Sequence, residues 1–393
     1  MKTTKKALIL YASYGDGHLQ VTRALTEALS AEGVEVETAD LFAEAHPFLN
    51  AAAKWFYIKS YAWFPSLYGW LYSSSKEMNH ETPFSRALHS FGISRLQKIL
   101  QNSRPDFVIN TFPMLAMPVL RTRGIVIPTY TVITDFTLHN RWIHRDIDRF
   151  YVASEELRHE LVGRGLETEQ VRVTGIPVKK AFRQPASVAR LCRKYGLDPR
   201  RRILLVMAGS YGVMRDLKEL CSEISDDFAI QTVMVCGNNQ KLQESMERVF
   251  RDHPHVKVLG FVEEVHELMA ISSCLVTKPG GITLTEALCC HLPTLLYRPV
   301  PGQERDNAEF MMAKGAALVA DYADQLVRQL RFLLHNPSAL DRMRRAAAKL
   351  RNPRSAEDIV SDMLQHIQAP VQETLSAASD QAVESMPLFH THS

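Results

Sequence analysis

The sequence lacks the patterns that mark exported, membrane-spanning and disulfide-bonded chains. Its six cysteines form no CxxC pair, and the adjacent Cys289 and Cys290 are poorly placed to bridge each other or chelate a metal. We therefore expect reduced, mostly buried thiols in a cytosolic protein. The apolar run that starts at Ala7 is too short for a signal peptide, and no stretch has the length and purity of a transmembrane helix. We expect a soluble or membrane-peripheral protein.

Strong charge and the common nucleotide fingerprints are also missing. The net charge of +3 gives no global sign of nucleic-acid binding. A basic run between Arg141 and Arg183 is typical of a solvated face and, less commonly, of attraction to an anionic surface. Neither GxGxxG nor GxxxxGK[ST] occurs in the glycine-rich turns, so hydride transfer and P-loop chemistry lack their sequence signal.

Two segments share one layout, in which a short apolar strand leads through a glycine turn into an amphipathic helix. The first has its strand at 7–11, its glycines at 15–17 and its helix from about Leu19; the second has its strand at 203–207 and its glycines at 209–212. Strands that are apolar on both faces are typical of parallel sheets covered by helices. Further strands are expected at 105–111, 127–134, 149–154, 229–237, 256–261, 273–278 and 292–297.

This alternation predicts an α/β protein with two doubly wound domains in tandem. We place the first domain at residues 1–178 and the second at 179–349, with the boundary in the polar, basic stretch that follows Pro177. Residues 368–393 are rich in Ser, Ala, Gln and acids without periodicity, and we expect them to form a disordered tail.

Two loops in the second half are candidates for phosphate binding, because exposed amides and a helix dipole favour an anion at a strand-to-helix turn. The loop at 208–212 has the right context but a short motif, and a plain chain reversal explains it equally well. In the loop at 277–288, Gly280 and Gly281 let the backbone approach a ligand, and Thr283 offers a hydroxyl. Glu286 lies one turn further on, placed to accept hydrogen bonds from ribose. A capping box of Thr283 with Glu286 is an equal alternative.

Two more loops carry polar groups at the ends of strands. The loop at 297–311 places a rigid Pro- and Gly-containing segment before Gln303, Glu304 and Asn307, which suits a polyhydroxylated ligand; a plain surface loop is the alternative. The loop at 15–18 ends on His18 at the start of a helix, where the dipole disfavours the imidazolium and keeps the ring able to accept a proton.

Taken in order along the chain, the motifs resemble those of one family. They are YGDGH, INTFPM, VITDFTLH, VTGIPV, LLVMAG, VTKPGGITLTEA and RPVPGQERDNA. From about Lys5 to about Gln365 the chain resembles the bacterial processive diacylglycerol β-glucosyltransferases, which group with plant monogalactosyldiacylglycerol synthases and the peptidoglycan lipid-intermediate N-acetylglucosaminyltransferase. The resemblance implies the GT-B fold, in which two Rossmann-like domains face each other across a cleft. It also implies that the C-terminal helices, at about 350–367, cross back onto the first domain.

The resemblance implies a membrane-peripheral inverting transferase that moves glucose from UDP-glucose to diacylglycerol and on to glucosyldiacylglycerol, for glycolipid and lipoteichoic acid anchor synthesis. UDP-galactose as donor, a soluble UDP-sugar 2-epimerase and a non-catalytic nucleotide-sugar binder remain the alternatives. No cofactor and no catalytic metal are expected, and the cleft loops contain no DxD motif; a helix N-terminus and backbone amides would stabilise the leaving UDP.

The resemblance also implies roles for particular residues. The diphosphate would lie on Gly280, Gly281 and Thr283, with Gly209 and Ser210 opposite. Glu286 would bind the ribose, and the backbone at Phe261 and Val262 would bind the uracil. Gln303 and Glu304 would bind the donor sugar, and Asn307 would support them. His18 is the favoured catalytic base, with Asp135 orienting it or acting as the base itself. The alternatives are that His18 only caps its helix or binds lipid, and that Asp135 caps the next turn.

The acceptor side is predicted from an aromatic segment at 48–76, which also carries lysines. Aromatic rings beside lysines fit the headgroup depth of a bilayer, although an aromatic core helix pair is the alternative. With the basic run, this segment predicts docking on an anionic membrane surface at the cytoplasmic face, with diacylglycerol drawn into the cleft. The residues expected at this surface are Trp55, Phe56, Tyr57, Trp63, Phe64 and Trp70.

Overall fold

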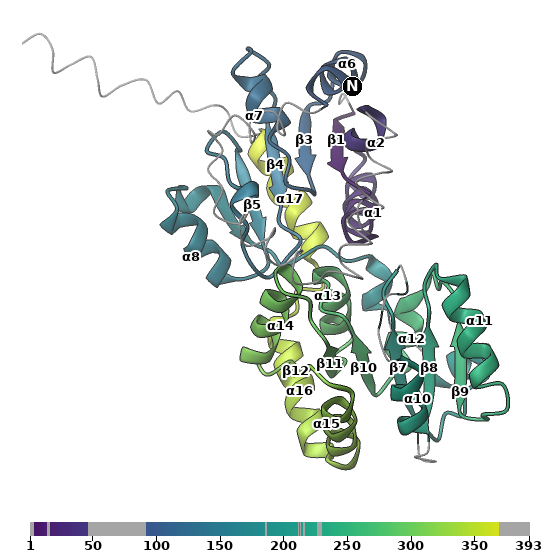
Figure 1. Ribbon diagram of the computed structural model, residues 1–393. Helices are drawn as coiled ribbons and strands as arrows, with labels where there is room; N and C mark the ends of the chain where they lie inside the picture. Colours follow the sequence, from purple (N-terminus) through teal and green to yellow (C-terminus); the bar gives the residue numbers. More distant parts are fainter. Residues whose placement is uncertain are drawn as a thin grey trace, which may run out of the picture.

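Two six-stranded parallel sheets carry the fold, one in each half of the chain (Figure 1). The computed structural model describes residues 4–13, 16–45, 92–184, 187–210, 212, 214, 217–225 and 230–368. Among these residues, no helix is both long enough and apolar enough to span a membrane. The aromatic segment at 48–76 and the tail from residue 369 lie outside the described residues, and so do the predictions made for them.

The first sheet has the strand order β2-β1-β3-β4-β5-β6. Its central strands are buried on both faces because helices cover both sides, as expected for a parallel sheet. The strands are β1 (Lys6–Tyr11), β2 (Glu35–Asp40), β3 (Phe107–Asn110), β4 (Thr129–Val132), β5 (Arg149–Val152) and β6 (Val171–Val173). The helices are α1 (Asp16–Ala31), α2 (Leu41–Ala45), α6 (Ile93–Ser103), α7 (Ala116–Arg121) and α8 (Glu155–Gly163), with short 3₁₀ turns at Asn140–Trp142, Thr168–Gln170 and Lys180–Arg183.

The second sheet runs β9-β8-β7-β10-β11-β12, the strand order of a dinucleotide-binding fold. Its strands are β7 (Arg202–Met207), β8 (Ile230–Val235), β9 (Val256–Leu259), β10 (Cys274–Thr277), β11 (Thr294–Tyr297) and β12 (Ala317–Ala320). Its helices are α9 (Val188–Tyr195), α10 (Leu217–Ser225), α11 (Gln240–Val249), α12 (Val265–Ile271), α13 (Gly281–Cys289), α14 (Gln303–Ala313), α15 (Ala323–His335) and α16 (Pro337–Leu350).

Each sheet has one point where the strand order reverses, and ligands bind at the carboxyl ends of the strands beside such a point. In the first sheet this point lies between β1 and β3, and in the second between β7 and β10. The predicted glycine turns follow β1, β7 and β10. The fold therefore brings the predicted loops to the ligand-binding ends of both sheets.

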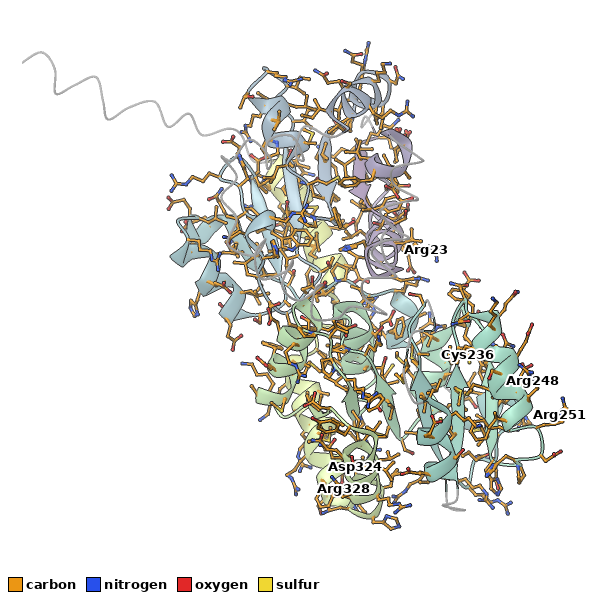
Figure 2. The ribbon with its side chains drawn as sticks, in the orientation of Figure 1. Arg23, Cys236, Arg248, Arg251, Asp324 and Arg328 are labelled. Carbon is orange, nitrogen blue, oxygen red and sulfur yellow. The ribbon has the colours of Figure 1, made fainter. Side chains whose placement is uncertain are left out.

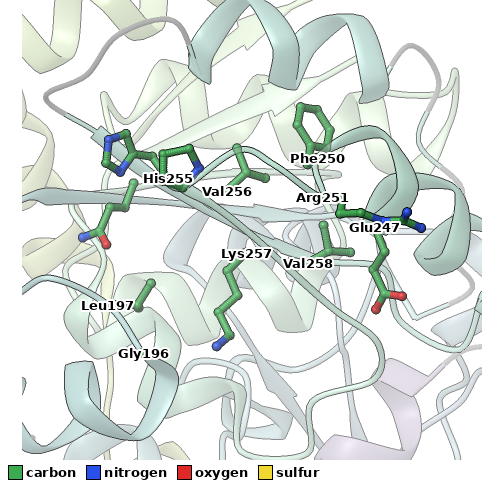
Figure 3. Close-up of a pocket in the computed structure, with 11 residues that line it drawn as sticks. Gly196, Leu197, Glu247, Phe250, Arg251, His255, Val256, Lys257 and Val258 are labelled. Atoms are coloured by element: carbon green, nitrogen blue, oxygen red, sulfur yellow. The ribbon is translucent and has the colours of Figure 1, made fainter.

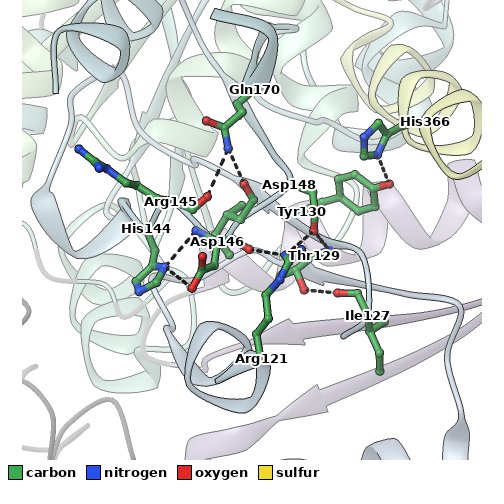
Figure 4. Close-up of polar contacts among 11 residues, drawn as sticks. Arg121, Ile127, Thr129, Tyr130, His144, Arg145, Asp146, Asp148, Gln170 and His366 are labelled. Atoms are coloured by element: carbon green, nitrogen blue, oxygen red, sulfur yellow. Dashed lines mark hydrogen bonds and ion pairs between the residues drawn. The ribbon is translucent and has the colours of Figure 1, made fainter. Parts of the chain in front are cut away.

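The last helix, α17 (Ser355–Gln368), returns to the first domain and packs against α1 (Figure 1). Its apolar face joins the core cluster that also contains residues of α1, β1 and β4. Asp362 anchors the helix, because it accepts hydrogen bonds from Arg149 Nη1 at 2.5 Å and from Tyr151 Oη at 2.8 Å. One turn later, His366 Nδ1 lies 2.9 Å from Tyr130 Oη (Figure 4).

The chain passes between the domains twice, and the two passages lie side by side. Asn352 Nδ2 donates to Thr174 O at 2.8 Å, and Ser355 Oγ donates to Gly175 O at 2.7 Å. A Cβ on Gly175 would lie 3.1 Å from Asn352 Cβ, and its φ of +78° also favours glycine. The return passage is thus hydrogen-bonded to the outgoing one.

Ion pairs neutralise much of the basic run that the sequence places between Arg141 and Arg183. Arg149 pairs with Asp362, Arg164 with Glu160, and Arg183 with Glu357. Near the start of β4, Asp148 accepts hydrogen bonds from Thr129 N at 2.8 Å and from Arg121 Nη1 at 3.4 Å (Figure 4). The arginines of these ion pairs therefore serve intramolecular contacts, and the prediction of a basic surface is weakened for this segment.

The cysteines are free thiols, as the sequence predicts. Five are buried and Cys290 is partly buried. Cys236, labelled in Figure 2, lies in the second domain at the end of β8, and burial raises its thiol pKa to about 11. Figure 2 also shows Arg248 on α11, Arg251 in the turn after that helix, and the Asp324–Arg328 pair on α15.

Candidate active site

The amino ends of α1 and α13 meet where the two domains face each other. A Cβ on Gly17 would lie 3.2 Å from Ile282 Cγ1, and a Cβ on Gly281 would lie only 2.2 Å from Thr134 O. No side chain fits at the second position without displacing backbone. The structure also begins α1 at Asp16, three residues before the predicted start at Leu19, so Gly17 lies in the first helical turn.

His18 is the third residue of α1, and its ring is held from the first sheet. Its Nδ1 lies 2.7 Å from Thr111 O and 3.4 Å from Thr134 Oγ1. Because a carbonyl oxygen only accepts, Nδ1 carries the proton, and Nε2 keeps the lone pair. Burial lowers the pKa of His18, while the charge of Asp135 and the bond to Thr111 act in the opposite direction. His18 is therefore a neutral imidazole whose basic nitrogen, Nε2, is not hydrogen-bonded by any residue that the structure describes.

Asp135 follows β4 and is bound from the second domain. Its Oδ1 accepts hydrogen bonds from Gln303 Nε2 at 2.5 Å and from Asn307 Nδ2 at 3.2 Å. Burial raises the pKa of the Asp135 carboxyl, and these two hydrogen bonds act in the opposite direction. Among the described residues no hydrogen bond joins Asp135 to His18, so its influence on the imidazole is electrostatic.

Glu286 lies in the second turn of α13, and its carboxylate has no hydrogen-bond partner within the described part of the chain. The helix begins at Gly281 with Gly280 as its N-cap, and no side chain caps it, so the capping box of Thr283 with Glu286 is wrong. Glu286 is 8% exposed, and burial raises its pKa to about 8, with Lys179 acting in the opposite direction. A buried carboxyl without partners is a group that a ligand with hydroxyl donors would satisfy.

Four other residues predicted for the donor lie near the carboxyl ends of β7 and β9, which β8 separates in the second sheet. Gly209, with φ of +79°, and Ser210 follow β7, and Ser210 O accepts a hydrogen bond from Asn238 N at 2.9 Å. Phe261 and Val262 follow β9; the Phe261 ring is 54% exposed and Val262 is partly buried. These groups thus lie at the same edge of the second sheet as the loop that leads from β10 into α13.

The residues predicted for the donor sugar already have partners. Glu304 Oε2 accepts a hydrogen bond from Val300 N at 3.0 Å within its own loop. Gln303 and Asn307 instead reach across to Asp135, one helical turn apart on α14. The structure thus joins the sugar loop directly to the acceptor-side carboxylate.

The sequence analysis missed Thr111 and Thr134, the two residues whose oxygens surround His18 Nδ1. Both are buried; Thr111 directly follows β3, and Thr134 lies two residues after the end of β4. Polar residues at the carboxyl end of a parallel strand are the signal that could have found them. The predicted acceptor residues lie outside the described residues: Trp55, Phe56, Tyr57, Trp63, Phe64 and Trp70.

A cavity of about 320 Å³ lies elsewhere in the second domain (Figure 3). Gln231, His255 and Val256 line it at the amino ends of β8 and β9, together with Lys257 and Arg251. Because nucleotides bind at the carboxyl ends of such strands, this cavity is not the donor site.

Comparison with known proteins assigns the family. The model described as "Monogalactosyldiacylglycerol (MGDG) synthase" matches residues 18–178, and "Glycosyl transferases group 1" matches residues 189–350. The protein named processive diacylglycerol beta-glucosyltransferase from Bacillus subtilis (strain 168) is 38% identical over 367 residues, which are 93% of this chain and 96% of that protein. The chain belongs to the processive diacylglycerol β-glucosyltransferase family. A second member, from Bacillus thuringiensis (strain Al Hakam), is 39% identical over 92% of this chain and 93% of its own length.

Solved structures confirm the predicted GT-B fold for this member of the glucosyltransferase family. MurG of Acinetobacter baumannii has a TM-score of 0.61 at 16% identity and covers 92% of this chain and 99% of its own. MnaA of S. aureus, solved with UDP, has a TM-score of 0.63 at 15% identity and covers 93% of this chain and 97% of its own. At such identities the likeness shows the fold alone.

Proposed function

We propose that the chain transfers glucose from UDP-glucose to diacylglycerol, and then to glucosyldiacylglycerol, with inversion at the anomeric carbon. The identity of 38% with a relative that bears this name, over 93% of the chain, supports the substrates. The observation that carries the chemistry is His18: a partly buried, neutral imidazole whose Nδ1–H is bound by Thr111 O and whose Nε2 has no hydrogen-bond partner among the described residues. That arrangement suits a general base.

In the proposed reaction the acceptor hydroxyl oxygen attacks the anomeric carbon of the donor. The new glycosidic C–O bond forms as the bond between that carbon and the diphosphate oxygen breaks, and UDP leaves with the electron pair. The hydroxyl proton passes to His18 Nε2, and the negative charge of Asp135 favours the imidazolium that results. His18 is preferred to Asp135 as the base because the hydrogen bonds from Gln303 and Asn307 stabilise the ionised Asp135 carboxylate, act to lower its pKa, and so make it a weaker proton acceptor.

The leaving group is proposed to rest on the amino end of α13, without a metal or cofactor. The nine-residue helix directs its free N–H groups and the positive end of its dipole to the loop at Gly280 and Gly281, where a diphosphate gains charge. Glu286 would accept hydrogen bonds from the ribose hydroxyls. The amino end of α13 is preorganised, so it stabilises the developing negative charge without rearrangement.

Membrane docking is the part of the proposal that rests on the aromatic segment and on surface charge. We place the protein at the cytoplasmic face of the membrane, where the segment at 48–76 would meet the headgroups. On α16, Arg342, Arg345 and Lys349 lie along one helix face, make no ion pair with any described residue, and border a cavity of about 340 Å³. Unpaired cations of this kind attract anionic lipid.

The direct test is incubation with labelled UDP-glucose and liposomes that contain diacylglycerol, followed by chromatography and mass analysis of the lipids. Glucosyl- and diglucosyldiacylglycerol are expected. Label that enters lipid only from UDP-galactose would correct the donor. Conversion of the UDP-sugar without lipid would indicate an epimerase, and UDP binding without any product would indicate a non-catalytic binder; either result contradicts the proposal.

A further inference from the structure

One fully buried side chain, Asn307 on α14, joins the two domains at the centre of the cleft. Its Oδ1 accepts a hydrogen bond from Phe136 N at 3.0 Å. Its Nδ2 donates to Asp135 Oδ1 at 3.2 Å and to Pro279 O at 3.1 Å. An asparagine amide has two N–H donors and one acceptor oxygen. Both donors and the oxygen of Asn307 are therefore in use. With 0% exposure, Asn307 cannot itself contact a ligand from solvent.

The three partners of Asn307 come from the two halves of the proposed reaction. Pro279 immediately precedes Gly280 and Gly281, the loop proposed for the diphosphate, whereas Asp135 and Phe136 follow β4 on the acceptor side. The spacing at this junction is tight, because a Cβ at Gly281 would lie 2.2 Å from Thr134 O and 3.0 Å from Asp135 Oδ1. A shift of either loop would therefore change the gap between donor and acceptor.

We propose that Asn307 is a positioning residue, whose amide holds the donor loop of the second domain in register with the acceptor loop of the first. This inference rests on the proposed function, because the gap that it sets is the one across which the sugar moves. It replaces the expectation that Asn307 supports Gln303 and Glu304 in holding the sugar.

Gln303 and Asn307 divide the junction between them. Both donate to the same oxygen of Asp135, but Gln303 is only partly buried and is the residue proposed to meet the donor sugar. When the sugar takes the Gln303 amide, Asn307 remains as the link to Asp135. Oδ2 of Asp135 receives no hydrogen bond from any described residue, so the charge stays available to the acceptor side.

The diagnostic variant is Asn307→Asp, which keeps the shape of the side chain and removes both N–H donors. It places a second carboxylate beside Asp135, and two such groups avoid repulsion only by sharing a proton. The junction should then re-form as the pH falls. The other charged groups that act on Asp135 are His18 on α1 and Asp306 on α14. Both are present in the variant and in the wild type, so their effects cancel in the ratio of the two kcat values. The pH dependence of that ratio therefore reports the new pair of carboxyl groups.

The experiment measures kcat and KM for UDP-glucose with diacylglycerol liposomes between pH 5.5 and 8.5, and UDP affinity by calorimetry. At pH 8 we expect kcat of Asn307→Asp to fall about 10²-fold, the cost of a misplacement near 1 Å, while UDP affinity stays within about threefold. The ratio of the kcat of Asn307→Asp to the kcat of the wild type should rise as the pH falls. Asn336→Asp, which exchanges one N-cap of α16 for another, is the matched control and should behave as wild type.

The inference would be overturned if the ratio of variant to wild-type kcat did not change with pH, or if kcat and UDP affinity fell equally. A second variant guards against misfolding: Asp135→Asn combined with Asn307→Asp restores a donor and an acceptor with their positions exchanged. The double variant should regain at least half of the loss in Tm that the single variant shows at pH 8, and no recovery would again overturn the inference. A wild-type protein that makes no glycolipid would refute the proposed function, whereas these Tm measurements would still test the junction.

Discussion

Glu286 offers a test of the donor site that needs no substrate. Burial raises the pKa of this carboxyl from 4.5 to about 8. The folded protein therefore keeps a proton that the unfolded chain releases above pH 4.5. Its contribution to stability is fully present below that pH, and it is lost as the pH rises through 8. Glu286→Gln removes the titration and keeps the size of the side chain.

The size of the effect follows from the two pKa values. Each full unit of pH between them is worth about 1.4 kcal/mol, and because the titration is incomplete at both ends the wild-type contribution falls by about 3.5 kcal/mol between pH 5 and pH 8. The free energy of unfolding of Glu286→Gln, measured relative to wild type, should rise by that amount over the same range. Hydroxyl donors favour the ionised carboxylate. Binding of ribose would therefore lower the raised pKa of Glu286 and release its proton.

Denaturant unfolding of both proteins at pH 5, 6, 7 and 8 measures the difference. Glu309→Gln, at an exposed position on α14, is the matched control and should stay within about 0.5 kcal/mol of wild type at each pH. Parallel stability curves for Glu286→Gln and wild type would refute the reasoning, because they would mean that Glu286 ionises as freely in the folded protein as in the unfolded chain.

Three further changes test other parts of the structure. His18→Ala should lower the transfer rate about 10²- to 10⁴-fold and leave UDP affinity within about twofold; equal losses of both, in kinetics and calorimetry, would contradict its role as base. Gly281→Ala places a Cβ 2.2 Å from Thr134 O and should cost about 1–3 kcal/mol in denaturant unfolding, whereas wild-type stability would show that the domains do not meet there. Asp362→Asn leaves Arg149 without its carboxylate and should cost about 2 kcal/mol at pH 7. Because the pKa of Asp362 is lowered, this difference should vanish as the pH falls below its ordinary value of 3.8, and a constant difference would count against the ion pair.

All but one of the strands that the sequence predicts are buried on both faces; the exception is β9, a partly buried edge strand. The three that the sequence does not predict, β2, β6 and β12, are all edge strands of their sheets. In β2 the acidic Glu35 and Glu37 alternate with other residues on a partly solvated strand, while β6 has three residues and β12 has four. Polar residues interrupt β2 and β6, so these two strands leave no continuous apolar run, and the apolar run of β12 is only four residues long.

The candidate site follows the same division between local and long-range information. Glycines and polar groups after apolar strands identify the loops, because strand ends determine where ligands bind. The Gln303–Asp135 bond joins residues 168 positions apart and depends on how two domains dock. The group that holds His18 is the backbone carbonyl of Thr111. Every residue type has a carbonyl, so no composition or motif reveals this contact.

The return of α17 has a consequence for the order of events during synthesis. The face of α1 that packs on α17 is made at the start of the chain, but Ile359 and Met363, which complete that core cluster, come near its end. A nascent first domain therefore lacks part of its core until the second domain has been translated. The domain that is made first is completed last, and its unpaired apolar face needs protection for as long as the ribosome is building the rest.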